Sequence, residues 1–389
     1  MNSSLKITPK LSVPLLATTL ILIVYLFIAS SIIDIHAGYA SVDGHYQFSF
    51  KWGTLGSGNG QFNKPSGIAV SPLGLVYVSD YGNNRIQMFQ LINVCPTGST
   101  QIVPGVCFVK SWGTFGSGNG QFNGPGDITL DSSSHVYVAD SGNHRIQVFN
   151  GSGAFISTWN SDGPGTVQFG VPTGVAVDTF TRNVYVTEGS NPGVLHKYRM
   201  LRPCIVGTIE VFSGLCFKSK LYFGSNPVGP HEQRTEWLDA VAVNSSSHEL
   251  YISDYITGRF PEINNSTIIR MTGDGTKLGS WGGEVGGDDG KFYSATGIAI
   301  GPSGSIYVAD FVFDRIQVFT NDGTFITKLE ASGSADGQFN KPYDVALDST
   351  GHVYVADSGN NRIQVFLWKT DVGGTGGAGG GTSPNIGVK

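Results

Sequence analysis

Charged residues are scarce in this sequence. Only 14% of its 389 residues are Asp, Glu, Lys or Arg, and the formal net charge is -5. No stretch of the chain is rich in Lys or Arg. Nucleic-acid binding needs clustered basic side chains that displace counterions from the phosphates, so this composition argues against a nucleic-acid partner.

Glycine and aromatic residues, by contrast, are abundant. Glycine occupies 55 positions, and Phe, Trp and Tyr together make up 11% of the residues. Such a composition is typical of chains built from short strands joined by tight turns. We therefore expect an all-β fold.

One long apolar stretch lies near the N-terminus. Residues 11–33 carry no charge, and the stretch is long enough to cross a bilayer of about 30 Å at about 1.5 Å per residue. Two interpretations of residues 1–37 remain open: an uncleaved transmembrane helix that anchors the protein in the cell membrane, or a long signal peptide cut near Ala37 or Ala40. Both place the rest of the chain outside the cytoplasm, either membrane-bound or secreted.

One unit of sequence returns almost unchanged at three places. It spans residues 60–89, 120–149 and 337–366, and the last copy reads GQFNKPYDVALDSTGHVYVADSGNNRIQVF. Weaker copies bring the number of modules to six, aligned on one apolar anchor in each: Ile68, Ile128, Val175, Val241, Ile298 and Val345. The shortest modules are about 47 residues long and the others hold insertions. A module repeated at this period indicates a repeat architecture.

Each module contains four short apolar segments separated by turn signals. In module two they are DITL, HVYVAD, HRIQVF and AFISTW. In the third segment, alternation predicts a half-buried strand with Ile146 and Val148 facing inward and Gln147 facing outward. Four-stranded units at this period are typical of propeller blades, and closing them into a ring removes exposed sheet edges.

The two ends of the array predict how the ring closes. The last module ends after its third strand, at Phe366, and residues 46–52 (YQFSFKW) precede the first module. Trp52 lies ten residues before Phe62, the spacing that also separates Trp112 from Phe122. We therefore expect residues 46–52 to form the missing fourth strand of the last blade.

The repeated pattern G-x-F-x-x-P, followed by V-Y-V-A-D-S-G-N-N-R-I-Q-V-F, resembles the NHL-repeat family of six-bladed propellers, which have a TolB-like architecture. The resemblance covers residues 45–370, and modules one, two, five and six match it best. Module three departs after Glu188, and module four has Leu238 in place of the proline and extra residues after Asp254. The resemblance implies an all-β, monomeric ring of six four-stranded antiparallel blades. Residues 371–389, rich in glycine, should form a flexible tail.

In propellers of this kind, the residues just before the innermost strands surround the mouth of the central channel. The resemblance places three carboxylates, three hydroxyls and a phenol there: Ser66, Asp127, Thr173, Asp239, Thr296, Tyr343 and Asp344. This mixture suits a divalent cation or a polyhydroxylated ligand. The alternative is a hydrated lip whose acids cap turns.

A metal-assisted lyase or hydrolase centred on Asp127, Asp239 and Asp344 is an alternative function. Amidating lyases with a similar propeller ligate zinc through histidines just before the innermost strands, and this sequence has no histidine there. No Ser-His-Asp arrangement can be argued from spacing either, because triad partners need not be close in sequence. The sequence thus supplies no catalytic constellation and implies no cofactor.

The four cysteines fall into two pairs with eleven residues between partners. Each pair begins six residues after the end of a third strand, in equivalent insertions. In an oxidising compartment we expect the disulfides Cys95–Cys107 and Cys204–Cys216, each closing a hairpin between third and fourth strands. Zinc ligation is the alternative, but no C-x-x-C or C-x-x-H spacing supports it.

The polar set that recurs in modules one, two and six is expected to be scaffold. The set Asp80, Asn83 and Arg85 has counterparts in modules two and six, and such residues close turns and pair arginine forks with acids or carbonyls. In a true site, such symmetry is usually broken.

Function is expected where the repeat fails, around module four. Its approach and its extra residues hold side chains that would form a raised lip for a partner: Glu232, Arg234, Trp237, Arg259 and Phe260. Trp and Arg are the residues that most often dominate interfaces. The alternative is that Trp237 replaces a core phenylalanine that module four lacks.

Four asparagines begin N-x-S/T sequences, which are glycosylation acceptors in exported proteins: Asn150, Asn244, Asn264 and Asn265. Such short motifs also arise by chance.

Together these features predict an extracytoplasmic binding scaffold that presents the channel mouth to a protein, glycan or small ligand. The metal-assisted enzyme and a structural component of the cell envelope are the alternatives.

Overall fold

The structure is a computed structural model. It describes residues 44–160, 163, 168–190, 192–201, 204, 209–212, 214–223, 235–257, 264–284 and 286–370. The chain divides into two compact units, and nearly all described residues belong to the unit Tyr46–Trp368. The other unit combines Met1–His45 with Lys369–Lys389.

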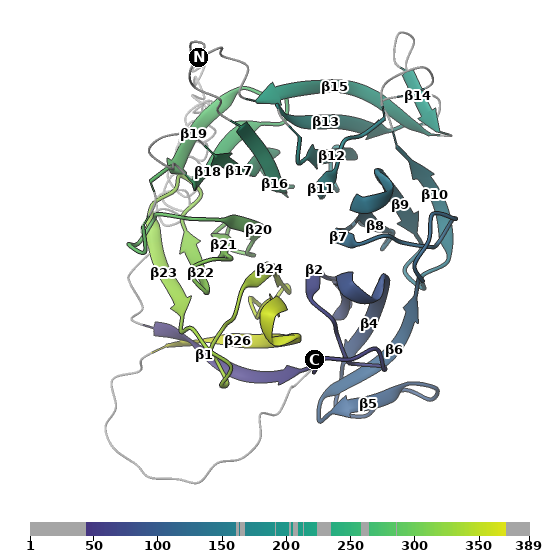
Figure 1. Ribbon diagram of the computed structural model, residues 1–389, viewed down its shortest axis with the longest axis vertical. Coiled ribbons are helices and arrows are strands. Elements are labelled where there is room, and N and C mark those ends of the chain that lie inside the picture. The colour runs from purple at the N-terminus through teal and green to yellow at the C-terminus, as the bar shows by residue number, and fades with distance from the viewer. Residues whose placement is uncertain are drawn as a thin grey trace, which may run out of the picture. The chain divides into compact units, whose positions relative to one another are not determined.

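Six antiparallel sheets are arranged as the blades of a ring in the unit Tyr46–Trp368 (Figure 1), so the predicted propeller is confirmed. Blade 2 has the strands β7 (Pro125–Leu130), β8 (Val136–Asp140), β9 (Arg145–Phe149) and β10 (Phe155–Trp159). Blade 4 has β16 (Thr235–Asn244), β17 (Glu249–Thr257), β18 (Asn264–Thr272) and β19 (Lys277–Gly282). Blade 5 has β20 (Ala295–Ile300), β21 (Ile306–Asp310), β22 (Arg315–Phe319) and β23 (Phe325–Glu330).

Two blades carry a fifth strand that the sequence did not predict. Blade 1 consists of β2 (Pro65–Val70), β3 (Leu75–Asp80), β4 (Arg85–Leu91), β6 (Val106–Trp112) and, at its outer edge, β5 (Thr100–Val103). Blade 3 consists of β11 (Pro172–Asp178), β12 (Asn183–Glu188), β13 (Gly193–Met200), β15 (Leu215–Phe223) and, at its outer edge, β14 (Ile209–Phe212). The fifth strands belong to the two cysteine-bearing insertions.

The last blade is completed from the start of the propeller, as expected. Its sheet order runs from β1 (Gly44–Trp52) to β26 (Arg362–Thr370), β25 (Val353–Asp357) and β24 (Pro342–Leu347). Trp52 is fully buried at the end of β1, and its ring lies 5.4 Å from that of Phe89 in blade 1. The N-terminal strand therefore closes the ring.

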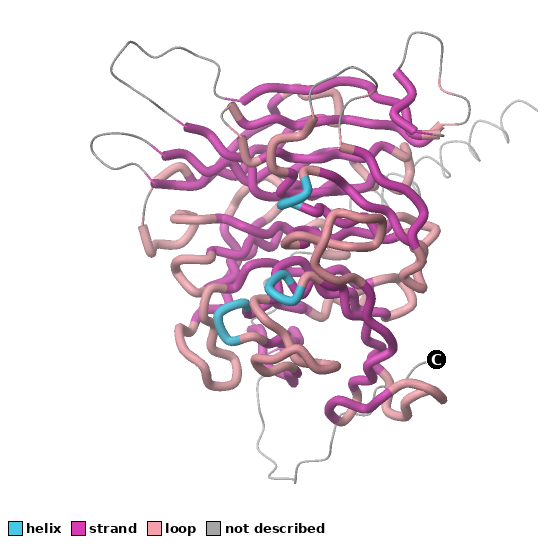
Figure 2. The backbone as a smooth tube through the Cα atoms, turned by 45° about the vertical axis from the view of Figure 1, so that its right-hand side comes forward, coloured by secondary structure: helices cyan, strands magenta, loops and turns pink. Residues whose placement is uncertain are grey.

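The predicted fold is corrected at its N-terminal element. Among the residues that the structure describes, no helix is long and apolar enough to cross a membrane. The segment 11–33, which the sequence predicts to be a transmembrane helix, lies outside those residues. The helical turns that the structure does describe are three short ones drawn in cyan in Figure 2: η1 (Tyr81–Asn83), η2 (Ser141–Asn143) and η3 (Ser358–Asn360).

The hydrophobic core consists of layers between neighbouring blades. One layer joins Tyr77 and Ile86 of blade 1 to Ile128 and Phe149 of blade 2, and comparable clusters lie between the other pairs of blades. Because a blade is covered on both faces, its third strand is buried on both faces. The prediction that Gln147 faces outward is therefore wrong: its side chain is fully buried.

The repeated Asp–Asn–Arg set forms a clamp at one end of modules one, two and six, as predicted. The buried carboxylate of Asp140 accepts hydrogen bonds from the Nε of Arg145 at 2.7 Å, from Asn143 at 2.9 Å and from Gln147 at 3.0 Å. Arg145 also donates to the carbonyl oxygens of Ser117, Gly118 and Gln121, each at 2.8 Å. The clamp thus ties the loop that enters the blade to its second and third strands.

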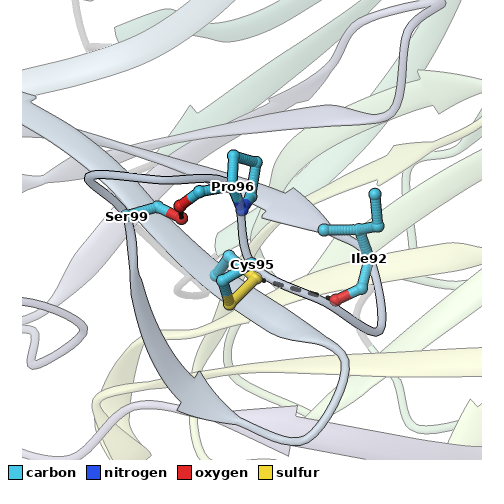
Figure 3. Close-up of a disulfide and its surroundings, with 5 residues drawn as sticks. Ile92, Cys95, Pro96 and Ser99 are labelled. Atoms are coloured by element: carbon cyan, nitrogen blue, oxygen red, sulfur yellow. Dashed lines mark hydrogen bonds between the residues drawn. A yellow bond between two sulfur atoms is a disulfide. The ribbon is translucent and has the colours of Figure 1, made fainter.

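Both predicted disulfides are present. Cys95 is bonded to Cys107 in the blade 1 insertion, and Cys204 is bonded to Cys216 in the blade 3 insertion. Figure 3 shows the first of them beside a turn in which the hydroxyl of Ser99 donates to the carbonyl of Pro96 at 2.7 Å. The alternative prediction, that these cysteines ligate zinc, is therefore wrong.

Removing one disulfide should destabilise the propeller measurably. Each bond closes a loop with a sequence separation of 12, which the chain-entropy estimate converts to about 3 kcal/mol. We expect the double variant Cys95→Ser/Cys107→Ser to lose about that much in urea unfolding, whereas Ser99→Ala in the same hairpin should lose about 1 kcal/mol or less. Equal unfolding midpoints for the double variant and the wild type would contradict the estimate.

Candidate functional site

The mouth of the central channel lies on the face of the ring where the innermost strands begin. The six innermost strands, β2, β7, β11, β16, β20 and β24, surround the centre of the ring in Figure 1 and line a cavity of about 250 Å³. The turns that follow the second strands lie on this same face, because Pro65 at the start of β2 pairs with Asp80 at the end of β3. We call it the mouth face.

Most of the predicted mouth residues do line this cavity. Its wall includes Asp127, Thr173, Asp239, Thr296, Tyr343 and Asp344, above a shaft formed by the apolar anchors of the six strands. Ser66 is buried and contributes no atoms to the wall. Sequence reasoning therefore located the mouth, and the individual contacts decide which of its residues remain open to a ligand.

Two of the three acids tie neighbouring blades together. Asp127 of blade 2 accepts hydrogen bonds from the backbone N–H groups of Ile128 at 2.7 Å and of Val175, in blade 3, at 2.8 Å. Asp344 of blade 6 likewise accepts from Val345 at 2.8 Å and from Ile68, in blade 1, at 2.9 Å. Each acid thus uses both carboxylate oxygens as an inter-blade staple.

Burial disfavours the ionised form of both stapling acids. Burial raises the pKa of Asp127 to about 7, and the backbone donors offset only part of this effect. Burial, followed by the negative charge of Asp127, also raises the pKa of Asp344 well above its ordinary value. The backbone contacts of both acids indicate a structural role and leave no carboxylate oxygen without a donor for a ligand.

The hydroxyls of the odd-numbered blades are also occupied. Each donates to a backbone carbonyl of the next blade: Ser66 to Pro125 at 2.9 Å, Thr173 to Leu238 at 2.6 Å, and Thr296 to Tyr343 at 2.7 Å. These three residues are followed by Gly67, Gly174 and Gly297. The two residues before the apolar anchor therefore alternate around the ring. Odd-numbered blades have Ser or Thr followed by glycine, and even-numbered blades have other residues at these two positions.

Glycine is required in the odd-numbered blades because the next blade passes very close. A Cβ atom on Gly67 would lie 2.6 Å from the carbonyl oxygen of Gly126, and one on Gly297 would lie 2.6 Å from the Cα of Asp344. On Gly174 it would lie 3.0 Å from the Cα of Ala240. Backbone atoms at these distances leave no room for a side chain.

Blade 4 breaks the pattern of staples. The position of the stapling acid holds Ala240, whose N–H donates to the Oγ of Ser253 at 2.8 Å. The acid stands one residue earlier, at Asp239, and its carboxylate makes no hydrogen bond with the residues that the structure describes. Burial, followed by the negative charge of Asp254, raises the pKa of Asp239 to about 7. Asp239 is thus the acid of the mouth that remains open.

Aromatic side chains stand at the mouth on blades 4, 5, 6 and 1. Trp237, Tyr343 and Tyr81 are 44%, 38% and 46% exposed. The ring of Tyr343 meets that of Phe311 edge-on at 5.9 Å. At the position of Tyr81, blades 2 and 3 have Ser141 and Gly189. We call Trp237, Phe311, Tyr343 and Tyr81 the aromatic arc.

The exposure of Trp237 argues against its alternative role as a core residue. Leu238, the next residue, is the buried one, and it pairs with Asp254 as Pro65 pairs with Asp80. Of the predicted partner lip, Trp237 is described, while Glu232, Arg234, Arg259 and Phe260 lie outside the described residues. The lip remains a prediction.

One polar cluster escaped the sequence analysis. In blade 3 the buried imidazole of His196 pairs through its Nε2 with the Oε1 of Glu188 at 2.8 Å. Glu188 stands where the other blades have the clamp aspartate, Val194 replaces the arginine, and His196 replaces the glutamine. These joint replacements were the signal in the sequence that could have revealed the cluster. The Glu188–His196 pair stands where the other blades have the Asp–Arg pair of the clamp.

Two of the acceptor asparagines stand directly before turns: Asn150 follows β9, and Asn244 is the last residue of β16. Asn150 accepts from the backbone N–H of Ser152 at 3.0 Å, and Asn244 accepts from that of Ser246 at 2.9 Å. Asn264 and Asn265 belong to β18, and their side chains lie outside the described part. Glycosylation of all four remains a prediction.

The described residues contain no group of three or more His, Cys, Asp or Glu side chains that could hold a metal ion. The carboxylate oxygens of Asp127 and Asp344 are already bonded to backbone N–H groups. A three-aspartate metal centre would have to break these staples. The side chains of Asp239 and Tyr343 are the mouth groups that make no hydrogen bond with the described residues.

Comparison with known proteins supports the repeat assignment. The family model of the NHL repeat matches residues 62–89, 122–149 and 339–366. The human protein "NHL repeat-containing protein 3" (Homo sapiens) is 37% identical over 95 residues, which are 23% of this chain and 23% of that protein. The chain thus matches about a quarter of the length of this curated relative.

Solved structures share the fold at low sequence identity. A structural genomics protein of unknown function from Bacteroides thetaiotaomicron VPI-5482 has a TM-score of 0.53 and 17% identity, with 84% of this chain and 77% of that chain covered. A streptogramin B lyase has a TM-score of 0.48 and 12% identity, with 84% and 98% covered. The first of these likenesses supports the fold and says nothing about activity.

Proposed function

Because the chain is a six-bladed β-propeller that carries NHL repeats, we propose that it is a binding scaffold that works outside the cytoplasm. Its mouth face receives a protein, glycan or small-molecule ligand. Propellers serve many functions, so the support comes from the site and not from the fold.

The observation that carries the proposal is the asymmetry of the mouth. Five of the seven predicted mouth residues bond to a neighbouring blade, whereas the carboxylate of Asp239 and the hydroxyl of Tyr343 make no hydrogen bond with the described residues. Both belong to the side of the ring that carries the aromatic arc. Polar groups and aromatic rings gathered at a concave opening are typical of binding sites.

The two disulfides support the location. Cytoplasmic thiols are kept reduced, and structural disulfides persist in oxidising compartments such as the bacterial periplasm, the endoplasmic reticulum and the cell exterior. All four cysteines of the sequence are used in this way, and none is free.

Blocking the mouth should abolish partner recognition. We would fuse a proximity-labelling enzyme to the full chain, use a membrane-impermeant label on intact source cells, and compare the wild type with Thr296→Trp. Thr296 lines the cavity, so an indole there fills the opening. The proteins labelled by the wild type should fall at least about tenfold with Thr296→Trp, a loss of about 1.4 kcal/mol or more in binding.

The matched control is Ser303→Trp, an exposed turn position of the same blade on the opposite face. Its labelling pattern should equal that of the wild type, and thermal unfolding followed by circular dichroism should show that both variants fold. Identical labelling by all three proteins would overturn the proposed function.

A further inference from the structure

The wall of the mouth is acidic, and it becomes negatively charged as its carboxyl groups, whose pKa values burial raises, ionise. Its side chains include three carboxylates, those of Asp127, Asp239 and Asp344, and no Lys, Arg or His. A concave opening lined by charges of one sign focuses its field on the entrance and attracts the opposite charge. The ligand chemistry that fits this wall is cationic.

Within this wall, Asp239 is the group that is available for pairing. The two stapling acids keep their oxygens on backbone donors of the next blade, whereas Asp239 has no such donor because Ala240 occupies the stapling position. Its partial burial and the charge of Asp254 make its ionised form unfavourable while the mouth is empty. A cation placed beside Asp239 would reverse that effect.

Tyr343 lines the same cavity as Asp239. The negative charge of Asp239 contributes to raising the pKa of Tyr255 on its own blade and the pKa of Tyr343 on blade 6, in each case after the larger effect of burial. Trp237 is two residues before Asp239 and half-exposed. Aromatic faces bind organic cations and the aliphatic stems that carry them.

The exposure of these groups bears on the shape of the cation. Trp237, Tyr343 and Tyr81 are more exposed than the carboxylates, which line the cavity together with apolar anchors such as Ile298 and Val345. A charged tip would stop at the carboxylates, and its stem would lie between the rings. A side chain that enters from outside has this geometry.

We propose that the mouth receives a lysine or arginine side chain of a partner protein, with its charged tip paired to Asp239 and its stem against Tyr343 and Trp237. This inference rests on the proposed function and specifies the chemistry of its ligand.

The probes are three peptides that differ at one position: acetyl-Gly-Ser-X-Ser-Gly-amide with X as lysine, arginine or norleucine. Norleucine keeps the length of the stem without the charge. Titrations of the full chain followed by NMR should give dissociation constants at least about tenfold lower for the two basic peptides than for the norleucine peptide. Equal binding of all three peptides would overturn the inference.

Asp239→Asn removes the charge and keeps the size. It should weaken binding of the arginine peptide about tenfold or more, whereas Asp274→Asn should not. Asp274 is an exposed acid of the same blade, on the opposite face, paired with Lys197. Binding that survives Asp239→Asn would contradict the proposed pairing.

Stability and pH separate this role from a structural one. Because the pKa of Asp239 is raised when folded, its ionisation disfavours the folded state above the ordinary carboxyl pKa of about 4. Asp239→Asn should therefore be as stable as the wild type at pH 8, or more so.

The arginine peptide should bind more tightly at pH 8 than at pH 6, because Asp239 is ionised above about 7. Asp254, Tyr255 and Tyr343 also face it, and the raised pKa values keep both phenols neutral in this range.

The labelling experiment distinguishes an error in the proposed scaffold function from an error in the proposed basic side chain. If Thr296→Trp loses its labelled neighbours on cells while Asp239→Asn keeps them, the scaffold function stands and the basic side chain is wrong. If neither variant changes the neighbours, both are wrong.

Discussion

Deletion of residues 44–52 should abolish the cooperative thermal transition of the propeller. These residues form β1, the outer strand of blade 6, and without it β26 becomes an open edge. The deletion also removes the buried ring of Trp52, the contact of Phe48 with Phe366 at 6.0 Å, and the 2.6 Å hydrogen bond between the hydroxyls of Tyr46 and Tyr307. Losing a buried Trp alone costs about 3–5 kcal/mol, and whole domains are stable by about 5–15 kcal/mol.

Single substitutions on the same strand provide the graded controls, measured by circular dichroism during heating. Trp52→Ala should give a folded protein with a clearly lowered Tm. Lys51→Ala, which removes a partly exposed ion pair with Asp336, should change stability by less than about 1 kcal/mol. A deletion variant that melts at the wild-type temperature would refute closure by this strand.

Arg145→Ala should cost about 3–5 kcal/mol, because it leaves the buried carboxylate of Asp140 without its cation. It also removes three hydrogen bonds to loop carbonyls of blade 2. Arg145→Lys keeps the charge but cannot reproduce the planar fork, so it should lie between alanine and the wild type. Urea unfolding measures all three.

The comparison for this variant is Arg270→Ala, which breaks an ion pair with Glu249 nearer the surface of blade 4. Its expected loss is about 1 kcal/mol or less, because water screens the pair and solvates the remaining acid. Equal losses for Arg145→Ala and Arg270→Ala would mean that the clamp is not a main element of blade stability.

Features that depend on local spacing were predictable from the sequence. The position of Trp52 relative to Phe62 repeats the spacing of complete blades, and this identified the closing strand. The equal separation of Cys95 from Cys107 and of Cys204 from Cys216 identified both disulfides. In each case the partners follow from a comparison of one module with another, without knowledge of how blades pack.

Features that depend on contacts between blades were not predictable. Gln147 alternates with apolar residues as a surface residue would, yet it is buried and hydrogen-bonded to Gly120 and Gln121 of the loop that joins blade 1 to blade 2. Asp127 and Asp344 look like free acids at a pore, and their role as staples became visible only when Val175 and Ile68 were found within hydrogen-bond distance. The resemblance located the mouth, and distances within the structure then separated Asp239 from the other two acids.

The alternation at the lip also limits how many blades this kind of ring can have. In this ring each glycine-bearing blade is followed by a blade with a side chain at that position, and Gly67, Gly174 and Gly297 each face backbone atoms of their neighbour too closely for a Cβ. A strict two-step pattern closes on itself only when the number of units is even. Insertion or loss of one blade would bring two units of the same kind together, whereas insertion or loss of two would preserve the order. At its inner edge the ring is therefore built from three pairs of blades, and the natural unit of duplication for this lip is the pair.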